Sequence, residues 1–72
     1  MSKRKQGELE SEVMGCLWDR PDGLTSQQIL SLLGDESLAI TTVLTVLSRL
    51  GDKELVRKES IGRSLLFVAT SS

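Results

Sequence analysis

Residues 39–52 read Ala39-Ile-Thr-Thr-Val-Leu-Thr-Val-Leu-Ser-Arg-Leu-Gly-Asp52, and this stretch decides the fold. At about 100° per residue, its apolar side chains fall within an arc of about 160° on a helical wheel. They are Ile40, Val43, Leu44, Val46, Leu47 and Leu50. The polar residues fill the opposite side. This separation predicts an amphipathic helix, although β-branched residues lower helix propensity. A strand over 40–46 is the alternative reading.

Two further helices are predicted before this stretch. Residues 8–18 place Leu9, Val13, Cys16 and Leu17 at helical spacing, and Pro21-Asp-Gly23 then breaks the chain. Thr25 and Gln28 have the spacing of a capping box, in which each side chain binds a backbone amide at the other residue. A second helix should follow and end near Gly34.

A β-hairpin is predicted after the third helix. Residues 55–60 and 65–69 read as strands, joined by a tight turn at 61–64. A lone hairpin is marginal in water, so it must pack on the helices. The predicted class is therefore α+β, mainly α: a winged helix-turn-helix with a recognition helix at 39–52 and a wing at 56–69. This domain should span 8–70, after a flexible basic N-terminal arm at 1–7 and before a frayed end at 71–72.

Composition excludes several classes of function. The chain has 72 residues, one cysteine and no histidine. It is one domain that can form no internal disulfide, zinc site or histidine-based catalytic centre. We expect no enzyme, no catalytic residues, no metal, no cofactor and no small-molecule ligand. The lone Cys16 reads as a buried core thiol in a reducing compartment.

The sequence also argues against a membrane location. No apolar run approaches the roughly 18 residues that a membrane-spanning helix needs. The basic N-terminus is not followed by the apolar stretch of a secretory signal. We therefore expect a cytoplasmic protein.

Charge is unevenly distributed along the chain. The net charge is only −1, which argues weakly against nucleic acid. However, residues 1–7 carry +3 and residues 55–72 carry +2, whereas 8–24 carry −4 and 35–54 carry −2. One basic side of the surface can follow from this distribution.

The polar face of the third helix indicates contact with DNA. It carries Thr41, Thr42, Thr45 and Ser48, where a solvent-facing helix usually has long Glu and Lys side chains. Short side chains allow close approach to the major groove, where hydroxyls bind phosphates or base edges and a threonine methyl meets a thymine methyl. Thr41 and Thr42 also occupy the first turn, whose free amides suit a phosphate oxygen. The alternative is that these threonines are merely tolerated at the surface.

Cations and helix starts supply further candidate contacts. Arg49 can bind a phosphate, or form an ion pair with an acidic residue of the first helix such as Glu12. Arg63 lies at the hairpin tip, where it can reach a minor groove or a phosphate, or remain solvated. Lys3, Arg4 and Lys5 can lie along phosphates or only keep the chain soluble. Thr25 and Ser26 can offer amides to a phosphate, although capping already explains them. The predicted DNA-binding residues are Thr25, Ser26, Thr41, Thr42, Thr45, Arg49, Arg57 and Arg63.

Four stretches together resemble the penicillinase-repressor (BlaI/MecI) family of bacterial transcription regulators. They are Gly7-Glu-Leu-Glu-Ser-Glu-Val-Met14 with Leu17-Trp18, Leu24-Thr25, Ala39 to Leu50, and Leu55-Val56 leading to Gly62-Arg63. The resemblance implies a winged-helix repressor of β-lactamase or related genes. Family members bind palindromic operators as dimers, and proteolysis in a later segment relieves repression. Base contacts would fall on Thr41, Thr42 and Thr45, and backbone contacts near Arg49 and Arg63.

The sequence departs from the family pattern in several places. The family dimerises through a C-terminal helical segment, so a homodimer is expected only if such a segment exists beyond residue 72. Lys53-Glu54 stands where a basic residue and glycine are usual, so the left-handed position after the helix lacks its glycine. Ile40 replaces a frequent aromatic residue, and Ser64-Leu65-Leu66 replaces aromatic and basic wing residues, which implies weaker phosphate binding. The cysteines of the copper-responsive relatives are absent.

The predicted function is sequence-specific repression of transcription through double-stranded DNA. The alternative is a winged-helix module that binds a protein and no DNA.

Overall fold

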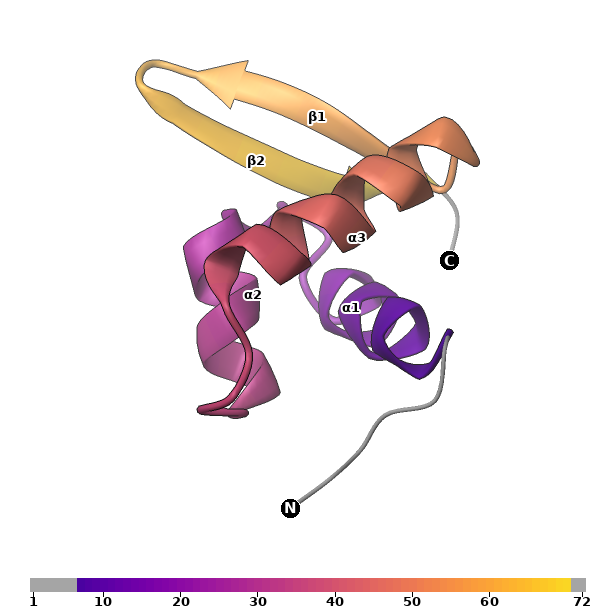
Figure 1. The fold of residues 1–72 in the computed structure, drawn as a ribbon. Coiled ribbons are helices and arrows are strands. Elements are labelled where there is room, and N and C mark those ends of the chain that lie inside the picture. Colours follow the sequence, from indigo (N-terminus) through magenta and orange to yellow (C-terminus); the bar gives the residue numbers. More distant parts are fainter. Residues whose placement is uncertain (1–6, 71–72) are drawn as a thin grey trace.

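The structure, a computed structural model, describes residues 7–70. Three helices precede an antiparallel hairpin, and α3 runs between the hairpin and the other two helices (Figure 1). The elements are α1 (Glu8–Trp18), α2 (Ser26–Leu33), α3 (Ile40–Asp52), β1 (Val56–Ile61) and β2 (Ser64–Ala69). The predicted winged helix-turn-helix order is confirmed. The predictions for the basic arm at residues 1–6, including Lys3, Arg4 and Lys5, and for 71–72 lie outside the described residues.

Local chemistry explains where α2 begins and ends. The Thr25 hydroxyl accepts a hydrogen bond from the Gln28 amide at 3.1 Å, and the Thr25 amide donates to Gln28 Oε1 at 2.9 Å. This is the predicted capping box. Gly34 follows the helix with a φ of 65°, a left-handed conformation that glycine adopts without strain.

The hairpin is tighter than the sequence predicts. Ile61 pairs with Ser64, so the turn consists of Gly62 and Arg63 alone, and both strands extend one residue toward it. A further pairing was not predicted: Leu24, just before α2, forms two backbone hydrogen bonds with Phe67 of β2, at 3.0 and 2.7 Å. This bridge ties the loop between α1 and α2 to the hairpin. A single bridged residue leaves no periodic pattern in the sequence, which is why it escaped prediction.

One apolar core joins all five elements. Among residues 7–70 it consists of Val13, Met14, Leu17, Leu24, Ile29, Val43, Val46, Leu47, Leu50, Val56 and Phe67. Two expectations about it were wrong. Cys16 is half-buried at the margin of the core, and Leu44 is largely exposed although it belongs to the apolar arc of α3. Burial raises the pKa of the Cys16 thiol, and the charges of Asp19 and Glu12 raise it further, so the thiol stays protonated at neutral pH.

Gly23 is required where the loop meets the hairpin. Its φ is 98°, and a Cβ there would lie 3.0 Å from Val68 Cγ2 and 3.3 Å from the Phe67 carbonyl oxygen. We expect Gly23→Ala to lower the free energy of unfolding by about 1–3 kcal/mol, because it combines backbone strain with a close contact. Urea denaturation followed by circular dichroism measures the loss.

Gly15→Ala is the matched control for this substitution. Gly15 lies inside α1, and a Cβ there would meet nothing within 4 Å. Alanine should therefore stabilise the domain by about 0.5–1 kcal/mol through helix propensity. Equal effects of the two substitutions would contradict the account of Gly23.

The end of α3 places a glutamate in a glycine conformation. The Leu55 amide donates to the Leu50 carbonyl at 2.9 Å and the Glu54 amide to the Gly51 carbonyl at 3.0 Å, which is the Schellman pattern. Glu54 has a φ of 62°, so its backbone is strained in a conformation that the usual glycine would adopt freely. The Thr70 hydroxyl holds the same segment by donating to the Glu54 carbonyl at 2.7 Å.

We expect Glu54→Gly to stabilise the domain by about 1 kcal/mol, because only glycine adopts this conformation freely. The melting temperature should rise by roughly 4–8 °C in a domain of this size. Glu54→Ala removes the same carboxylate but keeps a Cβ, so it should give no comparable gain. A rise of the same size in both variants would show that charge, and not backbone strain, is responsible.

Candidate nucleic-acid interface

The hydroxyl face of α3 is open to solvent. Thr41, Thr42, Thr45, Ser48 and Arg49 are all exposed, because the residues that α3 buries lie on its opposite side. The hairpin lies beside α3 (Figure 1), and the exposure of these side chains shows that it does not cover them. A second surface can therefore approach the short side chains of α3 closely, as a DNA major groove requires.

The threonines of this face differ in the hydrogen bonds they can make. The Thr45 hydroxyl donates to the Thr41 carbonyl at 2.9 Å, so its proton is already used and its oxygen is left to accept. In this state Thr45 suits the amino group of adenine or cytosine and not a phosphate oxygen. Thr41 and Thr42 make no side-chain hydrogen bond within residues 7–70, so both hydroxyls remain able to donate.

The start of α3 has no side-chain cap. Ala39, the N-cap, is extended and offers no hydrogen-bonding side chain. The Thr42 and Val43 amides donate to the Ala39 carbonyl, at 3.0 and 3.3 Å. The amides before them point out of the helix, where its dipole favours a negative group. This agrees with the expectation that the first turn suits a phosphate oxygen.

The cation that pairs α3 with α1 is Lys53 and not Arg49. Arg49 forms no ion pair with Glu12 or with any other residue between 7 and 70. Lys53, at the end of α3, instead pairs with Glu10 of α1 at 2.8 Å. Arg49 is thus left exposed beside the threonines, where it can meet a phosphate.

A groove separates α3 from the hairpin. It encloses about 590 Å³, and its walls come from both elements. Its lining residues are Leu44, Leu47, Ser48, Gly51 and Asp52 on α3, and Val56, Arg57, Lys58, Leu65 and Phe67 on the hairpin. The groove continues the hydroxyl face, since Ser48 belongs to both.

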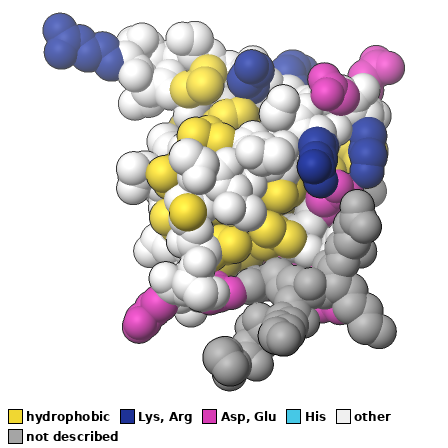
Figure 2. All heavy atoms as spheres, viewed as in Figure 1, with side chains coloured by type: hydrophobic (Ala, Val, Ile, Leu, Met, Phe, Trp, Pro, Cys, Tyr) yellow, Lys and Arg dark blue, Asp and Glu magenta, His cyan; other side chains and the backbone are white. Residues whose placement is uncertain are grey.

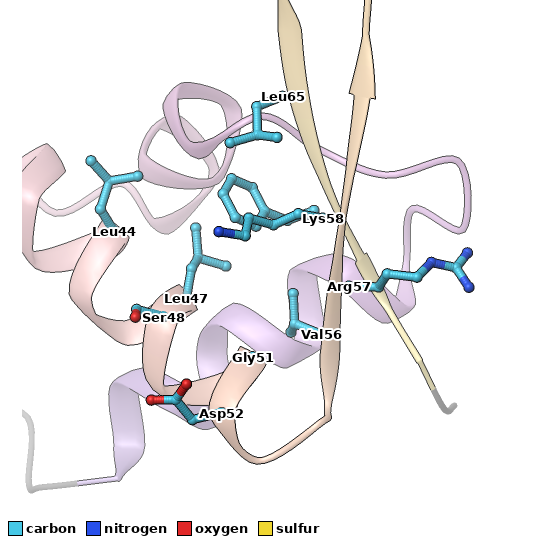
Figure 3. Close-up of a pocket in the computed structure, with 10 residues that line it drawn as sticks. Leu44, Leu47, Ser48, Gly51, Asp52, Val56, Arg57, Lys58 and Leu65 are labelled. Atoms are coloured by element: carbon cyan, nitrogen blue, oxygen red, sulfur yellow. The ribbon is translucent and has the colours of Figure 1, made fainter.

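Of the two neighbouring cations on β1, Lys58 and not the predicted Arg57 extends toward α3. Lys58 shares the strand face of the buried Val56, and its amine extends across the groove toward α3 (Figure 3). Arg57 also borders the groove, but its side chain points away from α3 and pairs with Glu59 at 2.8 Å. The alternation of side chains along a strand could have revealed this, because Lys58 lies two residues after the apolar Val56.

The remaining candidates lie at the ends of elements. Arg63 is exposed at the hairpin tip, as predicted, beside Gly62 with its φ of 60°. Thr25 and Ser26 are half-buried, and the Thr25 hydroxyl accepts the capping bond. They lie beside the hairpin because Leu24 is bonded to Phe67.

Basic, acidic and hydrophobic side chains are all exposed on the face shown in Figure 2. Figure 2 shows Lys and Arg side chains along the hairpin and at its tip, with hydrophobic side chains exposed between the hairpin and α3. Acidic side chains lie at the lower end of the view, by the connection between α2 and α3, and also at the upper right, near the C-terminal end of α3. The carboxylate of Asp52 borders the groove itself.

Within residues 7–70, no three potential metal ligands come together, and none of the three helices has the length and apolarity to cross a membrane.

Comparison with known proteins identifies relatives. Residues 6–72 match the model of the family described as penicillinase repressor. Two proteins named transcriptional regulator BlaI, from two strains of Mycobacterium tuberculosis, are each 47% identical to the chain over 51 residues. That match covers 69% of the chain and 37% of each relative, so the chain spans well under half of their length.

Proposed function

This chain belongs to the penicillinase repressor family, and we propose that it binds specific double-stranded DNA as the winged-helix part of a transcriptional repressor. The observation that carries the proposal is the exposed face of α3, on which hydroxyls replace the long charged side chains of an ordinary surface helix. Family membership supports the same conclusion and makes an enzymatic function untenable, since the relatives are named as regulators of transcription.

In the proposed complex, α3 lies in the major groove and the hairpin lies against the backbone. Thr41, Thr42 and Thr45 face bases, and Arg49 faces a phosphate. Thr25 and Ser26 start a helix beside the hairpin, where their amides can meet a phosphate on the flank. Arg63 reaches the neighbouring backbone or minor groove from the hairpin tip.

Two copies on a palindromic operator would sit about one helical turn apart, roughly 34–36 Å. A segment beyond residue 72 of a longer protein, or cooperation on the DNA, is needed to hold such a homodimer. We place the protein in the cytoplasm, where bacterial repressors meet their operators.

The experiment that tests this proposal selects duplexes from a random pool with the immobilised chain at low salt. Fluorescence anisotropy then compares the selected duplex with a scrambled one at about 50 and about 200 mM salt. We expect tighter binding to the selected duplex and a steep loss of affinity with salt. Equal affinity for all duplexes, or no binding, would favour the protein-interaction module.

Lys58 and Arg57 form a natural pair of variants for locating the backbone contact. We expect Lys58→Ala to weaken DNA binding about tenfold at low salt and to reduce the salt slope by about 1, because one phosphate contact is lost. Arg57→Ala should change affinity by less than about twofold, because its guanidinium is already paired with Glu59. A larger loss in the Arg57 variant would show that the two residues had been assigned in the wrong order.

A further inference from the structure

Leu44 is exposed in a way that its own helix does not explain. Its side chain is 43% exposed, whereas Val43 and Leu47, its neighbours in the apolar arc, are buried. It lies between the core side of α3 and the hydroxyl face, one helical turn after Thr41 and one turn before Ser48. Leu65 of β2, on the other wall of the groove, is also 43% exposed.

The groove between these leucines fits a partner that offers both apolar groups and negative charge, because its lining includes leucines and a lysine. Lys58 extends its amine into the same space, between Leu44 on one side and Leu65 on the other (Figure 3). A purely apolar partner would bury that ammonium without a counter-charge, which is costly. The edge of a DNA strand offers both a phosphate and apolar groups. Asp52 lies in the groove at the C-terminal end of α3, so a strand would pass on the side of Leu44 and Lys58.

We propose that Leu44 recognises a thymine by contact with its 5-methyl group. This inference rests on the proposed function. Thymine is the one base that presents an apolar substituent in the major groove. Leu44 borders the face that we assign to base contacts, so a base beside Thr41 and Ser48 falls within its reach. On contact, the leucine side chain and the thymine methyl both bury apolar surface, which favours binding. Removing that methyl should therefore reduce affinity about fourfold.

The test replaces each thymidine of the selected duplex by deoxyuridine, one at a time. These duplexes differ from the original by a single methyl group and keep every hydrogen bond. We expect the unaltered chain to lose about fourfold in affinity at one position. In Leu44→Ala that loss should disappear, while the preference for the selected duplex over a scrambled one is retained in part. Leu44→Met keeps an apolar side chain and should keep the loss.

Two control variants separate Leu44 from other apolar groups. Thr45→Ser removes the neighbouring threonine methyl and keeps the hydroxyl, so the deoxyuridine effect should persist. Leu32→Ala changes a leucine of α2 that is 50% exposed and does not line this groove, so it should behave as the unaltered chain does. Thermal melting confirms that each variant is folded.

The outcomes keep this inference separate from the proposed function. If the chain selects no duplex at all, the proposed function fails, and this inference fails with it. If selection occurs but no deoxyuridine position loses affinity, only the role of Leu44 is overturned. The same holds if the loss survives in Leu44→Ala or vanishes in Thr45→Ser.

Discussion

The double variant Thr42→Ala, Thr45→Ala is expected to lose about 10- to 100-fold of its discrimination between a selected duplex and a scrambled one. Both side chains are exposed, and each is assigned to a base edge in the proposed complex. Loss of two such contacts lowers affinity for the selected sequence much more than affinity for DNA in general, which depends on phosphates. Competition anisotropy with both duplexes measures the ratio directly.

Folding should not confound this result. Neither side chain belongs to the core, and alanine has a higher helix propensity than threonine, so the variant should melt at the same temperature or above. The variant Thr42→Ser, Thr45→Ser keeps both hydroxyls and is the rescue control. Unchanged discrimination in the alanine variant would remove these two threonines from the base-reading surface.

Leu47→Ala should have the largest effect on stability. Leu47 is only 2% exposed, and it lies where the core meets the floor of the groove. Truncating a buried leucine costs about 2–5 kcal/mol. A domain of this length has a free energy of unfolding of only about 4–11 kcal/mol at roughly 0.05–0.15 kcal/mol per residue. The variant should therefore lose a large share of its free energy of unfolding, as urea titration followed by circular dichroism will show.

Leu44→Ala is the matched control, since it makes the same chemical change one turn earlier on α3. With 43% of its side chain exposed, Leu44 should cost less than about 1 kcal/mol when truncated. The pair separates a residue that holds the fold from one that is free to serve an interface. Similar losses of stability in the two variants would mean that the wing packs on Leu44 more tightly than its exposure implies.

The sequence was sufficient to predict the fold because its strongest signals are local. The period of residues 40–50 identifies α3, and Thr25 with Gln28 marks the start of α2 by a reciprocal pair of hydrogen bonds three residues apart. The Leu24 bridge could not be predicted in this way. It depends on Phe67, which lies far along the chain, and only the packed structure brings the two backbones together.

The candidate site was predictable in part. A helical wheel places the hydroxyl face correctly, but it also counts Leu44 among the core residues, because a wheel cannot show how far the hairpin reaches over the helix. Arg57 was among the predicted contacts and Lys58 was not, although the two side chains carry the same charge. The orientation of Arg57 follows from the register of the strand. Glu59 lies two residues further along β1, so its side chain is on the same strand face and can pair with Arg57.

The bridge between Leu24 and Phe67 also bears on how the surface would meet a ligand. Because β2 is bonded to β1 on one edge and to Leu24 on the other, the root of the wing cannot swing independently of the helices. The domain would dock as a preorganised body and forfeit little conformational freedom on binding. Adaptation to the sequence-dependent shape of a duplex would then come from the two residues at the tip, Gly62 and Arg63, and from bending of the DNA itself.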